Sequence, residues 1–155
     1  GKRYLLKIEG AQHRQAVFIR NKRELVMQVR IGSTHAVRET LLYDWYREQL
    51  RQEAARLMAI WAPVVGRSPA KWGIKLMRTK WGSCNHHAQS IWLNIELARK
   101  PVKCLEYIVV HELVHLLEHT HNERFQAYMD RFMPDWQLHR KELNRLPIRH
   151  EDWEY

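Results

Sequence analysis

One segment of the sequence combines residue types and spacing that suit metal binding and hydrolysis. His111, Glu112 and His115 form an HExxH motif. Residues four apart lie on the same face of an α-helix, so both imidazoles can point at one ion. Neutral imidazole is a good zinc ligand, and three protein ligands leave a fourth position for water. Glu112 is expected to face that water as general base, so the motif predicts a zinc-dependent hydrolase that attacks a carbonyl or phosphoryl centre.

The residues around the motif indicate a helix that is buried on nearly all sides. The flanking residues are almost all apolar: Ile108, Val109, Val110, Leu113, Val114, Leu116 and Leu117. Burying a carboxylate and two imidazoles is costly unless they are paired or bind an ion. A metal site meets that condition. A purely structural cluster of hydrogen-bonded His and Glu side chains is the alternative.

A third ligand must come from outside these two helical turns. His121 lies ten residues after His111, which is the spacing of the extended HExxHxxGxxH pattern of metzincin proteases. Glu118 stands where that pattern has Gly, so a metzincin fold is not expected. We predict His121 as the third ligand, with His119 or a carboxylate such as Glu118 as the alternatives.

For His121 to face the metal, the helix must end after the motif and a new one must begin. The sequence offers two starts: Thr120 with Glu123 as a capping box, or Asn122 as an N-cap. Either start places His121 at the beginning of the new helix, pointing back toward the other two imidazoles.

The first 62 residues are predicted to form strands and then a long helix. Alternating apolar residues indicate strands over residues 4–8, 16–20 and 25–29, which we expect to pair as an antiparallel β-meander within residues 1–31. Helical spacing of apolar residues follows over 33–62. Ser33 or Thr34 is the expected cap and Pro63 the expected end.

The rest of the chain is predicted to form a hairpin and three helices, which together with the first part makes an α+β fold. The hairpin pairs one strand over 74–84 with another over 90–95, through a turn at 85–87. One helix begins at Pro101 and runs through His115. Two more are expected over 123–132 and 135–146. We treat residues 1–155 as one domain, with 73–146 as the hairpin and metal-binding core.

Composition and charge restrict the partners. The net charge is +9, which favours anionic partners, but basic and acidic residues are interspersed along the probable long helix. There is no zinc-finger cysteine pattern, helix-turn-helix signature or segregated basic run, which weakens a nucleic-acid-binding function. No apolar run approaches the roughly 20 residues that a membrane span needs. The start does not resemble a signal peptide, and the two cysteines fit a reduced state, so a cytoplasmic location is expected.

The motifs in combination resemble the YgjP-like metal-dependent hydrolase family, which is distantly related to SprT-like and minigluzincin zinc peptidases of the zincin type. The resemblance implies that His111, His115 and His121 bind the metal, with Glu112 as catalytic base. It covers most of the chain and is carried by the tracts 78–84 (RTKWGSC), 93–94 (LN), Pro101, 107–115 (YIVVHELVH), 121–125 (HNERF) and 134–135 (PD).

The resemblance also implies that a strand near Gly82 runs beside the active-site helix, where an edge strand can pair with an extended peptide. Gly82 suits a close backbone approach. The predicted substrate-binding residues are Arg78, Lys80, Trp81, Gly82 and Ser83. Core packing for Trp81 and a solvated edge for Arg78 and Lys80 are the alternatives. Tyr128, one turn after Phe125, is the candidate oxyanion donor.

These expectations define a metallohydrolase that uses one zinc ion, or another divalent transition metal, most consistent with a peptidase. Hydrolysis of a nucleoside triphosphate such as UTP to release pyrophosphate is the first alternative, since the resembling family implies it for some members and the charge suits a phosphate substrate. A nucleic-acid-associated protease or binding module is the second, by analogy with the SprT-like relatives.

Overall fold

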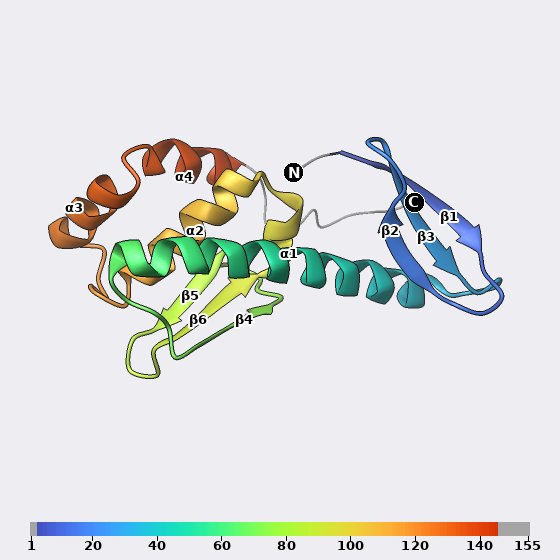
Figure 1. Cartoon of the computed structure of the whole chain (residues 1–155), viewed down its shortest axis with the longest axis horizontal. Helices are drawn as coiled ribbons and strands as arrows, with labels where there is room; N and C mark the ends of the chain where they lie inside the picture. The colour runs from blue at the N-terminus through green and yellow to red at the C-terminus, as the bar shows by residue number, and fades with distance from the viewer. Residues whose placement is uncertain (1–2, 146–155) are drawn as a thin grey trace.

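The computed structural model describes residues 3–145 and places a small sheet at one end of the long helix α1 (His35–Val65) (Figure 1). This sheet contains β1 (Leu5–Gly10), β2 (Ala16–Ile19) and β3 (Glu24–Val29). The three strands were predicted correctly, but the antiparallel meander was wrong. β1 pairs with β3 in parallel, β2 pairs with β3 antiparallel, and the order is β1-β3-β2. β3 is the most buried of the three strands, which fits its position in the centre of the sheet.

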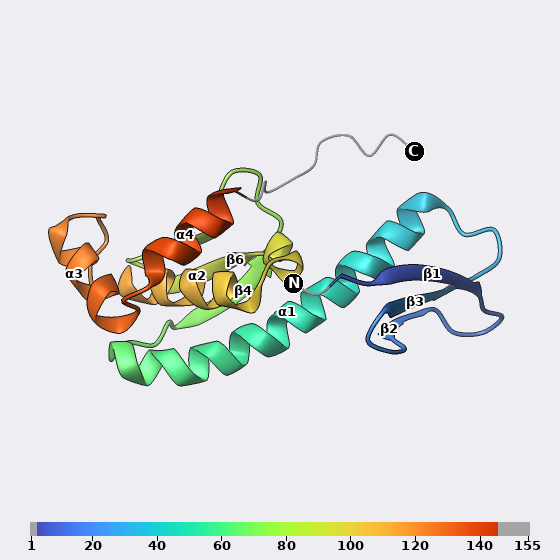
Figure 2. The same ribbon diagram turned by 90° about the horizontal axis from the view of Figure 1, so that it is seen from above.

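The long helix α1 runs from the first sheet to the second half of the molecule, as both views show (Figures 1 and 2). Thr34 is its N-cap and accepts a hydrogen bond from the Val37 N–H. The helix was predicted to end at Pro63 but continues past it to Val65. Pro63 has no backbone N–H to donate, but the helix does not end there. It ends at Gly66, whose φ of 77° gives a left-handed cap and whose N–H donates to the Ala62 carbonyl.

The second sheet contains β4 (Lys71–Lys75), β5 (Gly82–Asn85) and β6 (Ser90–Asn94), in the order β4-β6-β5. The predicted single strand over 74–84 was wrong. Residues 76–81 are irregular, and β4 and β5 lie on opposite sides of β6, parallel and antiparallel to it. β6 is buried along almost its whole length and therefore takes the centre. The hairpin between β5 and β6, with its turn after Asn85, was predicted correctly.

Four short helical elements complete the fold: the 3₁₀ helix η1 (Ile95–Arg99), α2 (Val102–Val114), α3 (Glu123–Phe132) and α4 (Trp136–Arg145). The predicted bounds of the three α-helices agree with the structure to within one residue. The exception is the predicted end of the last helix, residue 146, which lies outside the described residues. Pro101 is the N-cap of α2. η1 was not predicted.

α2 is the centre of the second half. It lies between α1 and α4 (Figure 2) and also contacts β5, β6 and α3. Nine of its residues are buried: Cys104, Leu105, Tyr107, Ile108, Val109, Val110, Glu112, Leu113 and Val114. The motif helix is therefore buried on nearly all sides, as its sequence predicted. Within residues 3–145, no helix is long and apolar enough to cross a membrane.

Candidate metal centre

Three imidazoles meet at the end of α2. The Nε2 atoms of His111, His115 and His121 lie 3.1 Å from one another in each of the three pairs. A tetrahedral zinc ion with bonds of about 2.0–2.1 Å separates its ligand atoms by roughly 3.3 Å. Three neutral imidazole nitrogens at this spacing cannot all be satisfied by hydrogen bonds to one another. The donor set therefore fits a divalent metal ion.

The end of α2 and the start of α3 bring these rings together. His115 is the C-cap of α2, and its N–H still donates to the His111 carbonyl. The chain then turns, and Asn122 becomes the N-cap of α3, with its Oδ1 accepting from the Phe125 N–H at 3.0 Å. Of the two starts that the sequence offered, Asn122 is the one used. His121 directly precedes this cap and points back toward α2.

Glu118 shapes the turn without joining the three imidazoles. Its carboxylate accepts hydrogen bonds from the Thr120 backbone N–H and hydroxyl. Its carbonyl lies 3.0 Å from Nδ1 of His115, so the Nδ1–H donates to it. That bond fixes the tautomer and leaves the Nε2 lone pair of His115 free for a metal. The side chain of His119 is 71% exposed and is not part of the group.

Phe125 forms an apolar support under the three rings. It is 2% exposed, and its ring centroid lies 4.9, 4.6 and 4.8 Å from those of His111, His115 and His121. Contact with all three imidazoles restricts their orientation. Phe125 falls within the helix predicted over 123–132, and nothing in the sequence indicated this contact.

Burial controls the protonation of the site. Burial, followed by the neighbouring His115 and His121, lowers the pKa of His111 to about 3. Burial also lowers the pKa of His115. Both rings are therefore neutral near pH 7, which is the form that binds metal.

Glu112 is 4% exposed, and burial raises its pKa to about 8, an effect that Lys80 partly opposes. Its Oε2 has no hydrogen-bond partner among the described residues. A buried carboxylate with an unpaired oxygen next to three converging imidazoles is placed to accept a proton. A divalent cation beside it would favour the ionised form.

The imidazoles and Glu112 line a cleft of about 430 Å³. Of the predicted substrate-binding residues, Lys80, Trp81, Gly82 and Ser83 line it and Arg78 does not. Tyr128 does not line it either, and its ring stacks on Phe132 with centroids 6.1 Å apart. The lining residues are Lys80, Trp81, Gly82, Ser83, Cys84, His86, Ile108, His111, Glu112, His115, His119 and His121.

Apart from His119, which the sequence offered only as an alternative metal ligand, three of the lining residues were not predicted. Cys84 follows Gly82 at the spacing that puts two side chains on the same face of a strand, which was a usable signal. Burial, followed by the nearby Glu112, raises the pKa of its thiol to about 11. Ile108 is one turn before Glu112 on α2. His86 lies in the β5–β6 turn, 3.3 Å from the His115 carbonyl through Nδ1, and nothing local in the sequence indicated this contact.

Gly82 brings the backbone of β5 directly against Glu112. A Cβ atom added at this position would lie 2.9 Å from the Glu112 carboxyl carbon and closer still to Oε1. A side chain at position 82 would therefore force the Glu112 carboxylate or the β5 backbone to shift. The predicted close approach at Gly82 is present, and its partner is the carboxylate of the HExxH motif.

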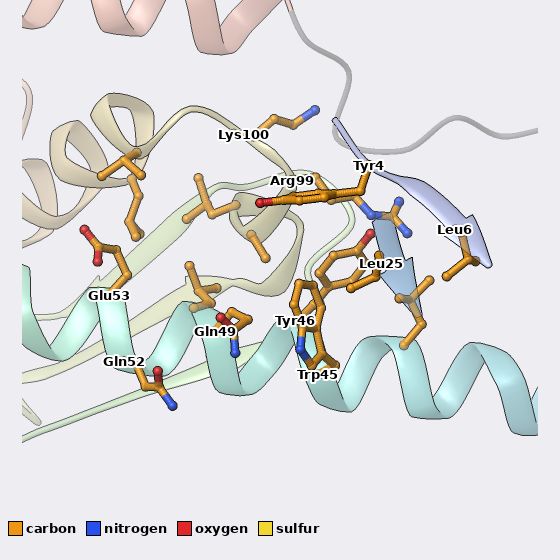
Figure 3. Close-up of a pocket in the computed structure, with 16 residues that line it drawn as sticks. Tyr4, Leu6, Leu25, Trp45, Tyr46, Gln49, Gln52, Glu53, Arg99 and Lys100 are labelled. Atoms are coloured by element: carbon orange, nitrogen blue, oxygen red, sulfur yellow. The ribbon is translucent and has the colours of Figure 1, made fainter. Parts of the chain in front are cut away.

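A second cavity of about 470 Å³ lies between the first sheet, α1 and η1 (Figure 3). Tyr4, Tyr46 and Arg99 gather at one side of it. Arg99 donates to Glu96 at 3.3 Å and lies over the Tyr46 ring, and Glu53 at the other side pairs with Arg56. No histidine or cysteine is among the residues that line it, so the group of three imidazoles lies in the smaller cleft alone.

The chain as a whole is similar to known metallopeptidases. A sequence profile described as "YgjP-like, metallopeptidase domain" matches residues 1–146. No curated protein matches the sequence. The metallopeptidase zymogen abylysin of Pyrococcus abyssi has a similar structure, with a TM-score of 0.55 and 16% identity over 59% of this chain and 92% of that one. The metallopeptidase zymogen jannalysin of Methanocaldococcus jannaschii is also similar, with a TM-score of 0.50 and 16% identity over 62% of this chain and 94% of that one. At such identities the likeness shows a shared fold.

Proposed function

The chain belongs to the YgjP-like metallopeptidase domain family, and from this premise we propose that it is a zinc-dependent peptidase. His111, His115 and His121 would hold the metal and Glu112 would act as general base. The observation that carries this assignment is the group of three Nε2 atoms, 3.1 Å apart, beside the buried carboxylate of Glu112.

A zinc ion held there would lower the pKa of a bound water to about 7 and polarise a carbonyl group. The chain itself supplies a base and a fixed geometry. One oxygen of Glu112 has no partner within residues 3–145, and the β5 backbone at Gly82 limits where its carboxylate can lie. The bond from His115 to the Glu118 carbonyl and the ring of Phe125 hold the imidazoles in place. These contacts support a preorganised site, which reduces the reorganisation needed during the reaction.

β5 is the element best placed to bind a peptide substrate. It is an edge strand that pairs only with β6 in the described sheet, and it contacts α2 next to Glu112. An exposed strand edge can add an extended peptide through backbone hydrogen bonds. Lys80 and Trp81 lie in the cleft just before this strand, so they are proposed to contact substrate side chains.

The direct test is to load the purified protein with zinc and assay it against an unstructured casein labelled with a quenched fluorophore. We expect cleavage that is abolished in Glu112→Gln, with the variant still binding zinc, because Glu112 is not in the ligand group. The control is His119→Ala, which should keep its zinc affinity because His119 is outside the ligand group.

Three outcomes would contradict the proposal or change it. If Glu112→Gln remained active, Glu112 would not be the base. Release of pyrophosphate from UTP that depends on Glu112, without cleavage of any peptide, would assign the site to nucleotide hydrolysis. Cleavage only in the presence of DNA would instead indicate a nucleic-acid-associated protease.

A further inference from the structure

Asn94, the last residue of β6, uses the full hydrogen-bonding capacity of its side chain. The residue is fully buried, at 0% exposure. Its Nδ2 donates to the backbone carbonyls of Met77 and Lys80, both at 2.8 Å. Its Oδ1 accepts from the backbone N–H groups of Met77 at 3.4 Å and Glu96 at 3.2 Å. A carboxamide has two N–H donors and two lone pairs, so all four are used.

The topology of the second sheet explains why such a residue is needed. Because β4 and β5 lie on opposite sides of β6, residues 76–81 must cross its end. No strand in the described part of the chain pairs with the backbone of residues 76–80 there, and the fully buried amide of Asn94 would itself be costly without partners. Asn94 supplies partners to this backbone. Its own backbone N–H also donates to the Trp81 carbonyl at 2.9 Å. One residue thus binds the backbone of three of the six crossing residues.

This crossing segment leads directly into the cleft. Its last two residues, Lys80 and Trp81, line the cleft, and Gly82 follows with its backbone against Glu112. A small displacement of β5 would either crowd the Glu112 carboxylate or open space for water beside it. His111, His115 and His121 are on α2 and at the start of α3, and make none of the hydrogen bonds that hold the segment.

We propose that Asn94 is a positioning residue for the peptidase site. It fixes the crossing segment 76–81, and through that segment it sets the position of β5 against Glu112 and presents Lys80 and Trp81 to the substrate. The expected effect of Asn94 on catalysis rests on the proposed function, whereas its effect on the position of β5 depends on the fold alone. Since Asn94 acts one step away from the chemistry, its loss should alter turnover and substrate binding while leaving metal binding intact.

Asn94→Asp tests this inference, because the aspartate keeps the shape and both acceptors but loses both donors. The carboxylate oxygen that replaces Nδ2 would face the carbonyls of Met77 and Lys80. In the zinc-loaded full chain we expect kcat/KM for the labelled casein to fall at least tenfold, with zinc affinity within twofold of wild type. Hydrogen exchange of amides 80–85 should become at least tenfold faster, while α2 keeps its protection.

Matched variants separate this role from general stability. Asn21→Asp makes the same change in an exposed turn, where the acceptor for the Arg23 and Glu24 N–H groups is retained, and should leave exchange in β5 and activity unchanged. Gly82→Ala crowds Glu112 directly and should lower kcat without faster exchange. If Asn94→Asp does not fold, Asn94→Ala, which leaves space for water, is measured in the same way.

Unchanged exchange in residues 80–85 together with unchanged kcat/KM would overturn the inference. So would a loss of zinc affinity and of protection throughout the chain, which would show a purely structural role. If the wild-type protein cleaves no peptide, the proposed function fails on its own. Hydrogen exchange would still decide whether Asn94 fixes β5, because that readout requires no turnover.

Discussion

His121 is the metal-site residue whose position depends most on the local turn. His111 and His115 share one face of α2, so their spacing alone aligns them. His121 reaches the same point because Asn122 starts a new helix immediately after it. The sequence contained this information, since Asn122 was one of two visible cap candidates. The sequence alone did not indicate whether Thr120 or Asn122 is the cap. That choice depends on the hydrogen bonds from Thr120 to Glu118 in the folded turn.

Replacing His121 and replacing His119 should have different effects on metal binding. We expect His121→Ala to weaken zinc binding by more than about 100-fold, because even the outer partners of metal ligands contribute about 10–100-fold. His119→Ala should change the affinity by less than about threefold. Competition with a chromophoric zinc chelator measures both. The reverse ranking would show that the third ligand is His119.

Tyr128 shows the limit of prediction for single residues. Its place in the sequence, one turn after Phe125, made it a candidate oxyanion donor. In the structure its ring stacks on Phe132 and does not line the cleft. Which side of a short helix faces a site is determined by packing against other elements, here α2, and the chain around Tyr128 contains little information about that packing.

At the scale of elements, the sequence located helices and strands better than it paired them. Alternation identified the strands of the first sheet, yet both sheets place their third strand in the centre. Pairing is decided by which strand can be buried on two faces. β3 and β6 have that character, but a local pattern does not reveal partners that are far apart in sequence. The division of 74–84 into β4, a crossing segment and β5 was missed for the same reason.

The crossing segment offers a matched pair of basic residues for testing substrate contacts. Lys80 lines the cleft, whereas Arg78, two residues earlier, does not. With two casein-derived peptides that differ by one acidic residue, Lys80→Ala should lower kcat/KM for the acidic peptide about threefold to fivefold. The effect should diminish in high salt, which screens an exposed pair. Arg78→Ala should affect neither peptide, and an equal loss for both variants would place the substrate outside the cleft.

At the scale of the whole molecule, the candidate metal centre lies where α2 and the start of α3 pack against each other. Two of its imidazoles are on α2, one of them as the cap, and the third precedes α3. An ion held by all three would link the two helices. Any ligand that binds only the folded chain raises its stability in proportion to the logarithm of its concentration.

Zinc should therefore raise the melting temperature. At a free zinc concentration of about 1,000 Kd, the gain in unfolding free energy is about 4 kcal/mol. His111→Ala should abolish this gain, whereas Glu112→Gln should retain it. Thermal unfolding followed by circular dichroism, with and without a chelator, measures the difference. Equal melting temperatures with and without zinc, for the wild-type chain, would contradict the assignment of these residues as ligands.

The order of strands in the two sheets has a consequence for how the chain folds during synthesis. In each sheet the first strand is parallel to the third and the second is antiparallel to it, so the third strand supplies every pairing. On the ribosome, β1 and β2 emerge with no partner until β3 has left the exit tunnel, and β4 and β5 wait likewise for β6. Each sheet should therefore form in one step, when its last strand arrives.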